Sequence, residues 1–325
     1  MIRYILLGVL SFSFLNGYEG EHSVQDLYNS IQDINSPTYE EYLRIQDFLQ
    51  FSERPYLKEL DHFYDPTIPR DLRRRTCRQI KLVGDQGEMP TFEVHHFGES
   101  ESKRCILLYS TYNSPYPRML KRTLFQIKNE GFVGDVIVRI GGYPWMDNEG
   151  IKLCHVPYSW KVLFLCEAID LGYKEILYLD SSMIALNDLS LLFSMLNKNG
   201  YLFCDSGVNL DYGYSFGHHC NAAIHSNGIT ALDEINKIPH LATPIIGINA
   251  EDIRVGKVIA EWLRKTELVM PCMNLYPEEL CFSIAAWEAG LSPNIHLGEI
   301  VCTEENKHLS LYFPFWSFLL DLYRE

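Results

Sequence analysis

The sequence lacks several short patterns that would identify its chemistry at once. It contains no Gly-x-Gly-x-x-Gly fingerprint and no Gly-x-x-x-x-Gly-Lys-Ser/Thr loop, so the common dinucleotide-binding and P-loop signatures are missing. It contains no Cys-x-x-Cys pair, which argues against a zinc ribbon. Beyond the N-terminus, no apolar run reaches the ~18 residues that a membrane-spanning helix requires. The function must therefore be inferred from single polar residues and their positions in the fold.

Positive charge is scarce in this chain. Its 28 Lys and Arg against 42 Asp and Glu give a net charge of −14 at pH 7. Such an acidic protein is not expected to have nucleic acid as its main partner. The hydrophobic content of 47% and the charged content of 22% are those of an ordinary globular protein. A length of 325 residues suffices for one large domain or two modest ones.

The N-terminus has the pattern of a secretory signal peptide. One positive residue, Arg3, precedes an apolar run over Ile5–Leu15, and the polar and small residues Asn16 and Gly17 follow. We therefore expect the protein to enter the secretory pathway and to be periplasmic or extracellular. An uncleaved membrane anchor and a buried first strand or helix are the alternatives.

Nine cysteines are present, so at least one thiol of a monomer stays unpaired. Cys272 with Cys281, or Cys154 with Cys302, could pair in an oxidising compartment. The sequence alone does not choose between these pairs, and it leaves the redox state open.

From Cys105 onward, short apolar runs alternate with helical patterns, which is typical of an α/β fold. We expect a mixed, mostly parallel sheet flanked by helices. The expected strands are Cys105–Ser110, Asp135–Ile140, residues 175–179 and Tyr201–Cys204; the expected helices are Arg118–Glu130, Trp160–Leu171, Leu189–Leu196, Val255–Arg264 and Glu278–Gly290.

Three regions follow from this pattern. Residues 1–20 form the signal peptide or anchor. Residues 21–100 form an N-terminal extension with helical and β character, and residues 101–325 form the main domain.

The most informative stretch is an apolar strand that runs directly into polar residues. Residues 175–179 are followed by Asp180, Ser181 and Ser182. In open α/β sheets, ligands bind just beyond the carboxyl ends of the strands, which makes Asp180 a candidate ligand-binding carboxylate. A simple strand-ending turn is the alternative, because Asp and Ser are common turn residues. Tyr109, Ser110 and Thr111 end the first strand in the same manner.

The order of these segments resembles that of a known family. Lys161 lies in a helix upstream of the strand, and Met183, Ile184 and the segment from Asp188 to Phe193 follow Ser182. This block is similar to the donor-binding block of glycosyltransferases with the GT-A fold, in which an apolar strand ends in a DxD-type motif. Weaker similarities extend the resemblance over residues 105–300.

The resemblance implies a nucleotide-sugar donor and an acceptor that is a glycan, a protein or a small molecule. It implies that the donor-binding residues are Tyr109, Ser110, Thr111, Lys161, Asp180, Ser181 and Ser182. Glu278 and Glu279 match a region that supplies catalytic or acceptor-facing carboxylates. Acidic residues at a helix start can equally be dipole partners.

A divalent cation is the further implication. In such enzymes, Mn²⁺ or Mg²⁺ held by carboxylates neutralises the diphosphate of the donor. Asp180 matches the first acid of the motif, and His296 or His308 would be a second ligand. The final acid of the motif is replaced by Ser182, which puts metal dependence in doubt.

Two main hypotheses result. The first is a glycosyltransferase of the hexosyltransferase type that uses a donor linked to UDP. The second is a secreted binding protein that keeps the transferase fold without activity and binds through aromatic residues such as Trp145, Tyr158 and Trp160. A hydrolase using Ser181 or Ser182 is a more distant third hypothesis.

Overall fold

A seven-stranded sheet forms the centre of the protein. The computed structural model describes residues 29–46, 80–98, 103–154, 156–210, 221–229, 232–272, 277–302 and 322–324. In the sheet, the strand order is β1-β3-β2-β4-β7-β6-β8. The strands are β1 (Thr91–Phe97), β2 (Arg104–Ser110), β3 (Gly134–Ile140), β4 (Glu175–Asp180), β6 (Tyr201–Asn209), β7 (Pro239–Asn249) and β8 (Ile295–His296).

The sheet is mixed, and most of its strands share one direction. β2 is parallel to β3 and β4, and β6 is parallel to β8. β7 lies antiparallel between β4 and β6, and β1 is antiparallel to β3 at the edge. Five strands therefore run one way and two run the other. This arrangement confirms the predicted α/β class with a mixed, mostly parallel sheet flanked by helices.

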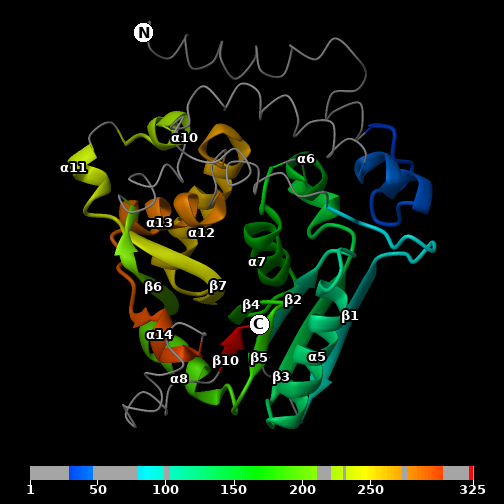
Figure 1. The fold of residues 1–325 in the computed structure, drawn as a ribbon, viewed down its shortest axis with the longest axis horizontal. Helices are drawn as coiled ribbons and strands as arrows, with labels where there is room; N and C mark the ends of the chain where they lie inside the picture. The colour runs from blue at the N-terminus through cyan, green and yellow to red at the C-terminus, as the bar shows by residue number, and fades with distance from the viewer. Residues whose placement is uncertain are drawn as a thin grey trace, which may run out of the picture.

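Helices cover both faces of this sheet. The helices α7 (Trp160–Asp170), α12 (Ile253–Glu267) and α13 (Pro277–Glu288) pack on one face, and α5 (Tyr116–Asn129) and α8 (Ser190–Asn199) pack on the other. Figure 1 shows α12 and α13 side by side near β7. Alternate residues of each strand enter the two cores, as the pleat requires. In β2, for example, Leu107 and Tyr109 join one core, whereas Ile106 and Leu108 join the other.

Short elements complete the described part of the chain. They are η2 (Met146–Gly150), α6 (Ile151–Leu153), α10 (Asn221–Ser226), α11 (Leu232–Ile235), η3 (Met270–Cys272) and α14 (Leu297–Ile300). A small second sheet contains β5 (Met183–Ala185), β10 (Leu322–Arg324) and β9 (Val301–Cys302).

The N-terminal extension is described only in part. Residues 39–46 are helical, and Tyr42 and Ile45 from this segment are buried in the same core as α7. β1 pairs with β3 over its whole length, so the main sheet begins at Thr91. The expected signal peptide, residues 1–20, lies outside the described residues. Within the described part of the chain, no helix is long and apolar enough to cross a membrane.

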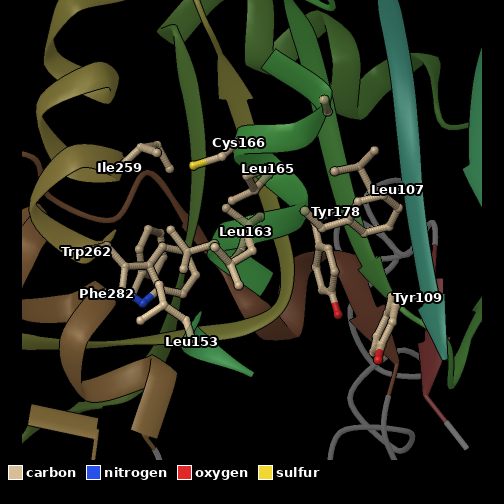
Figure 2. Packing of buried hydrophobic residues seen from close by; sticks show 14 of the residues in the cluster. Leu107, Tyr109, Leu153, Leu163, Leu165, Cys166, Tyr178, Ile259, Trp262 and Phe282 are labelled. Carbon is tan, nitrogen blue, oxygen red and sulfur yellow. The ribbon is translucent and has the colours of Figure 1, made fainter. Parts of the chain in front are cut away.

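Aromatic packing between α12 and α13 anchors one core. Trp262 on α12 is almost fully buried, and its ring centroid lies 4.8 Å from that of Phe282 on α13. Phe282 in turn contacts Phe203 of β6 edge to face, at 4.8 Å between centroids. Figure 2 shows Trp262 and Phe282 beside Leu163 and Leu165 of α7. The contact therefore holds two helices and the sheet together.

We expect Trp262→Ala to lower the free energy of unfolding by ~3–5 kcal/mol, because the substitution leaves a cavity in a close-packed core. Chemical denaturation followed by circular dichroism measures this change. Ile253→Ala is the matched control on the same helix, since Ile253 is 79% exposed; its effect should stay within ~0.5 kcal/mol. Equal effects of the two substitutions would contradict the packing described.

Candidate functional site

A polar cluster lies at the carboxyl edge of the sheet. β4 ends there with Asp180, and β7 begins there with residues near His240, because β7 runs in the opposite direction. The helices α7 and α13 also begin at this edge, and they contribute Lys161 and the adjacent acids Glu278 and Glu279. Four elements that are distant in the sequence thus supply charged or polar side chains to one place.

Lys161 is the centre of this cluster. Its ammonium nitrogen Nζ lies 3.2 Å from Oδ1 of Asp180 and 3.1 Å from Oε1 of Glu278. It also lies 3.0 Å from Oγ1 and 3.1 Å from the carbonyl oxygen of Thr243. The Lys161 side chain is only 4% exposed. A buried ammonium is costly unless it is paired and hydrogen-bonded, and these four oxygens meet that requirement.

The charge state of Lys161 follows from its surroundings. Burial works to lower the pKa of the ammonium, but the negative charges of Asp180 and Glu278 outweigh burial and raise the pKa above its usual value. Lys161 is therefore a fixed positive charge and not a proton-transfer group. Its two ion pairs hold the carboxylates of Asp180 and Glu278 in place.

Thr243 reaches the cluster because β7 is irregular there. Ile246 pairs with Phe203, but the next β6 residue, Cys204, pairs with Ala242. The β7 residues between Ala242 and Ile246 therefore form a bulge, where a strand can re-aim a side chain. Pro244 fits such a bulge because it has no N–H group for the ladder. The bulge leaves both the carbonyl and the hydroxyl of Thr243 directed at Lys161.

The two adjacent acids of α13 have different partners. Glu278 accepts a hydrogen bond from the Thr243 hydroxyl at 3.0 Å and pairs with Lys161. Oε2 of Glu279 lies 3.2 Å from Nε2 of His240, and the other oxygen of Glu279 faces the backbone N–H of Thr243 at 3.3 Å. The Ser206 hydroxyl lies 2.9 Å from Nδ1 of His240. The network thus extends from β4 across β7 to β6.

These environments push the pKa values of the two acids apart. Burial raises the pKa of Glu278, and Lys161 offsets this only in part. Burial is the largest influence on Glu279, but the contacts with His240, the charge of Lys161 and the backbone N–H of Thr243 together outweigh it and lower the pKa of Glu279. Two neighbouring carboxyl groups with separated pKa values can take different chemical roles. Glu279, 14% exposed, is the one favoured as an ionised base.

Asp180 is positioned by Tyr178 as well as by Lys161. The hydroxyl of Tyr178 donates to Oδ1 of Asp180 at 3.2 Å, and Asp180 keeps 20% of its side chain exposed. Burial and the nearby Asp180 charge raise the pKa of Tyr178, so this phenol stays protonated and remains a donor. Asp180 is therefore a held carboxylate that still faces outward in part.

The residues at the end of β2 lie next to Asp180 in the sheet. Tyr109 pairs with Asp180 across the two strands, but its side chain is buried and its hydroxyl donates to the carbonyl of Gly142 at 3.0 Å. Figure 2 shows Tyr109 and Tyr178 with their hydroxyl groups directed to the same side. The buried Ser110 hydroxyl has no hydrogen-bond partner within the described residues. Thr111 is half-buried, and its hydroxyl accepts from the N–H of Asn113 at 3.4 Å.

The serines that follow Asp180 form the turn between β4 and β5. Ser181 is buried, whereas Ser182 is half-buried. A guanidinium nitrogen of Arg122 on α5 lies 3.4 Å from the carbonyl oxygens of Ser182 and Met183. The hydroxyl of Thr123 contacts the carbonyls of Ser181 and Met183. The helix α5 therefore fixes the shape of this turn and brings a positive charge beside it.

The described residues do not fit the divalent cation that the resemblance implies. No group of three His, Cys, Asp or Glu residues in this part of the chain is arranged to hold a metal ion. His296 caps α14, and its Nδ1 accepts from the N–H of Gly298 at 3.1 Å. His308 lies outside the described residues. Oδ1 of Asp180 is already paired with an ammonium group, so we derive no chemical step through a metal.

The aromatic residues that the binding-protein hypothesis requires make contacts with other residues of this chain. Trp145 and Trp160 pack against the α7 core, and the indole N–H of Trp145 donates to Asp170 at 2.8 Å. Tyr158 and Trp160 stack at a tilt, with their ring centroids 4.8 Å apart. All three side chains are half-buried, so they form no fully exposed platform.

The sequence patterns missed three members of the cluster, namely Thr243, His240 and Ser206. A sequence signal existed for Thr243, since the Thr-Pro step interrupts an otherwise apolar run. His240 lies at the start of β7 and not at its end, so a rule that looks beyond the carboxyl ends of strands does not select it. The sequence also contains a Gly-x-Ser-x-Gly pattern at residues 213–217, and these residues lie outside the described part of the chain.

Comparison with known proteins gave matches only among solved structures. No family model and no curated protein matches this sequence. The chain is similar to the bifunctional glycosyltransferase WbbM over 70% of its length, with 10% identity and a TM-score of 0.43, and it spans about half of that chain, 47%. It is also similar to the galactosyltransferase LgtC, solved with donor and acceptor sugar analogues. That match has 10% identity and a TM-score of 0.40, and it covers 68% of this chain and 86% of LgtC.

A third similar structure is mouse xyloside xylosyltransferase 1. The identity is 10% and the TM-score is 0.40, with 68% of this chain and 97% of that chain covered. With identities and scores this low, the functional proposal rests on the residues of this chain.

The Glu279–His240 pair predicts a specific pH dependence of stability. The pKa of Glu279 is lower in the folded protein than its usual 4.5, so its stabilising contribution is present above that value and is lost as the pH falls through the folded pKa. We expect Glu279→Gln to be less stable than wild type at neutral pH, with a difference that shrinks in acid. Urea unfolding across this pH range measures it. Glu130→Gln, at an exposed position, should show no such convergence, and a pH-independent difference for Glu279→Gln would contradict the assignment.

Proposed function

We propose that this protein is a glycosyltransferase that moves a sugar from a nucleotide-sugar donor, linked to UDP, to an acceptor hydroxyl. The observation that carries this proposal is the convergence of Lys161, Asp180, Glu278 and Glu279 at the carboxyl edge of the sheet. All four were candidates from the sequence, and they lie on three different elements. Ligands bind at this edge in open α/β sheets.

The charge of the cluster suggests which part of the donor lies against it. Three carboxylates surround one ammonium, so the cluster carries excess negative charge when the acids are ionised. A diphosphate would be repelled there, whereas a neutral sugar rich in hydroxyl groups can donate hydrogen bonds to carboxylate oxygens. We therefore place the sugar against Asp180 and Glu279.

The diphosphate then belongs at the turn between β4 and β5. Arg122 brings positive charge to the carbonyls of Ser182 and Met183. The hydroxyls of Ser110, Ser181 and Ser182 are the candidate donors to the nucleotide part, and the orphaned Ser110 hydroxyl gains a partner when the ligand binds.

The reaction breaks the bond between the anomeric carbon and the diphosphate oxygen, and the acceptor oxygen forms the new bond to that carbon. The acceptor hydroxyl loses its proton in the process. Glu279 is the group we assign to orient this hydroxyl and accept its proton, because part of its side chain is exposed and Glu278 is already paired with Lys161. Glu278 is instead assigned to hold Lys161 in place.

Binding of the donor depends on Asp180 in this proposal. We expect UDP-sugars to bind with a measurable affinity, and Asp180→Asn to weaken binding roughly 10- to 100-fold, as the loss of a hydrogen bond to a charged group does. Isothermal titration with a panel of UDP-hexoses measures this, and release of free sugar measures the minimum activity. Asp147→Asn is the control, since Asp147 is exposed on η2.

Two results would redirect the proposal. Tight binding without any turnover of donor, over a broad acceptor panel, would favour the binding-protein hypothesis. The absence of binding to every nucleotide sugar would overturn both the transferase assignment and the donor-binding role of Asp180.

The ion pair of Lys161 with Asp180 also predicts that donor binding does not require a divalent cation. We expect the affinity for the bound UDP-sugar to be the same in excess EDTA and in excess Mn²⁺, because an ammonium already occupies the position beside Asp180. The same titration in the two buffers tests it. A donor affinity that appears only with Mn²⁺ would show that Asp180 releases Lys161 to bind a metal.

A further inference from the structure

Two cysteines meet in the buried core where η3 packs against α13. Sγ of Cys272, at the end of η3, lies 3.4 Å from Sγ of Cys281 on α13. Both residues are almost completely buried, and both belong to the same core as Trp262 and Phe282. Their separation in the sequence is nine residues.

The sulfur atoms are close enough for a bond without a rearrangement of the fold. A disulfide has a sulfur–sulfur distance of ~2.05 Å, so the two atoms must approach by little more than an ångström. η3 packs directly against α13, which keeps the two Cα positions close as the bond forms. The structure thus brings together one of the two cysteine pairs that the sequence left open, Cys272 with Cys281.

The position of Cys281 connects this pair to the candidate site. Residues three apart on a helix lie on neighbouring positions of its surface, so Cys281 is the neighbour of Glu278, the partner of Lys161. A covalent bond from Cys281 to η3 would hold the first turns of α13, on which Glu278 and Glu279 are placed. It would also remove two buried S–H groups, which are weak donors with few acceptors in an apolar core.

We propose that Cys272 and Cys281 form a disulfide bond that tethers α13 to η3 when the chain folds in an oxidising environment. The oxidant is a second disulfide, carried by a small thiol or by a thiol oxidoreductase. One cysteine thiolate attacks a sulfur of that disulfide and releases a thiolate; the other cysteine thiolate then attacks the mixed disulfide and releases the second thiolate. The protein loses two electrons and two protons, and the oxidant becomes two thiols.

In the folded protein, both the two free thiols and the disulfide of this pair should exchange only slowly. Burial raises the pKa of the Cys281 thiol well above its usual range, and the thiolate is the form that reacts. Exchange is therefore expected while the chain folds, before α13 and η3 pack, and to be slow afterwards. A protein folded with oxidant keeps the bond, and one folded with reductant keeps two thiols.

The test is to refold the full chain with oxidised and reduced glutathione, and separately with dithiothreitol alone. Free thiols are then blocked with N-ethylmaleimide in denaturant without reductant, and the digest is analysed by mass spectrometry. We expect a linked peptide containing Cys272 and Cys281 in the glutathione sample, lighter by two hydrogen atoms than the sum of its parts. Cys105 and Cys204, in β2 and β6, should carry the maleimide in both samples.

The melting temperature supplies a second measurement. The oxidised protein should melt at a higher temperature than the reduced protein, and Cys272→Ser should abolish this difference. Cys166→Ser, on α7, is the control that should keep it. Complete alkylation of both Cys272 and Cys281 after refolding with glutathione, or a link from either to another cysteine, would overturn the proposal. None of these outcomes depends on whether the protein transfers sugars.

Discussion

The buried ammonium of Lys161 is the constraint on which the candidate site depends. It joins α7, β4, β7 and α13 through oxygens of Asp180, Thr243 and Glu278 at 3.0–3.2 Å. None of these groups would be stable alone at this depth, because a buried charge without a partner costs several kcal/mol. The site thus also connects four secondary-structure elements, and its carboxylates are held in position before any ligand binds.

The antiparallel direction of β7 makes the contact between Thr243 and Lys161 possible. Because it runs against β4 and β6, its first residues lie at the edge where its neighbours end. The bulge at Thr243 and Pro244 then turns a backbone carbonyl toward Lys161 instead of into the ladder. A regular strand would have placed that carbonyl in a sheet hydrogen bond, and Lys161 would have lost one of its four oxygens.

The sequence predicted those strands and helices whose position follows from a single local pattern, either an apolar run or a helical periodicity. The helices α5, α7 and α8, the strands β2, β3 and β4 and the start of β6 lie where the apolar runs and helical periodicity placed them, within a few residues. The short parallel strand β8 was not predicted. Lys161, Asp180, Glu278 and Glu279 were candidates from the sequence because each lies near an end of a strongly patterned element, and the structure brings the four together. β7 was not recognised as a central strand, since Pro244 argues against that assignment and its antiparallel direction is set by tertiary contacts.

His240 and Ser206 were not predicted because their positions also depend on tertiary contacts. His240 and Ser206 join the cluster only because β6 and β7 pair with each other, and no spacing in the sequence records that pairing. The choice between the two cysteine pairings likewise needed the packing of η3 against α13. Metal binding is a different case: among the ligands that the family motif suggested, Asp180 pairs with Lys161 and His296 caps α14, whereas His308 lies outside the described residues.

The linkage through Lys161 has an evolutionary consequence. Loss of the ammonium alone would leave Asp180 and Glu278 facing each other without compensation, and loss of either acid would leave a buried cation with too few partners. Single substitutions at these positions should therefore be rare. In related sequences, a substitution at position 161 should be accompanied by one at position 180 or 278. Such joint replacement would mark the lineages in which the chemistry of this edge has changed.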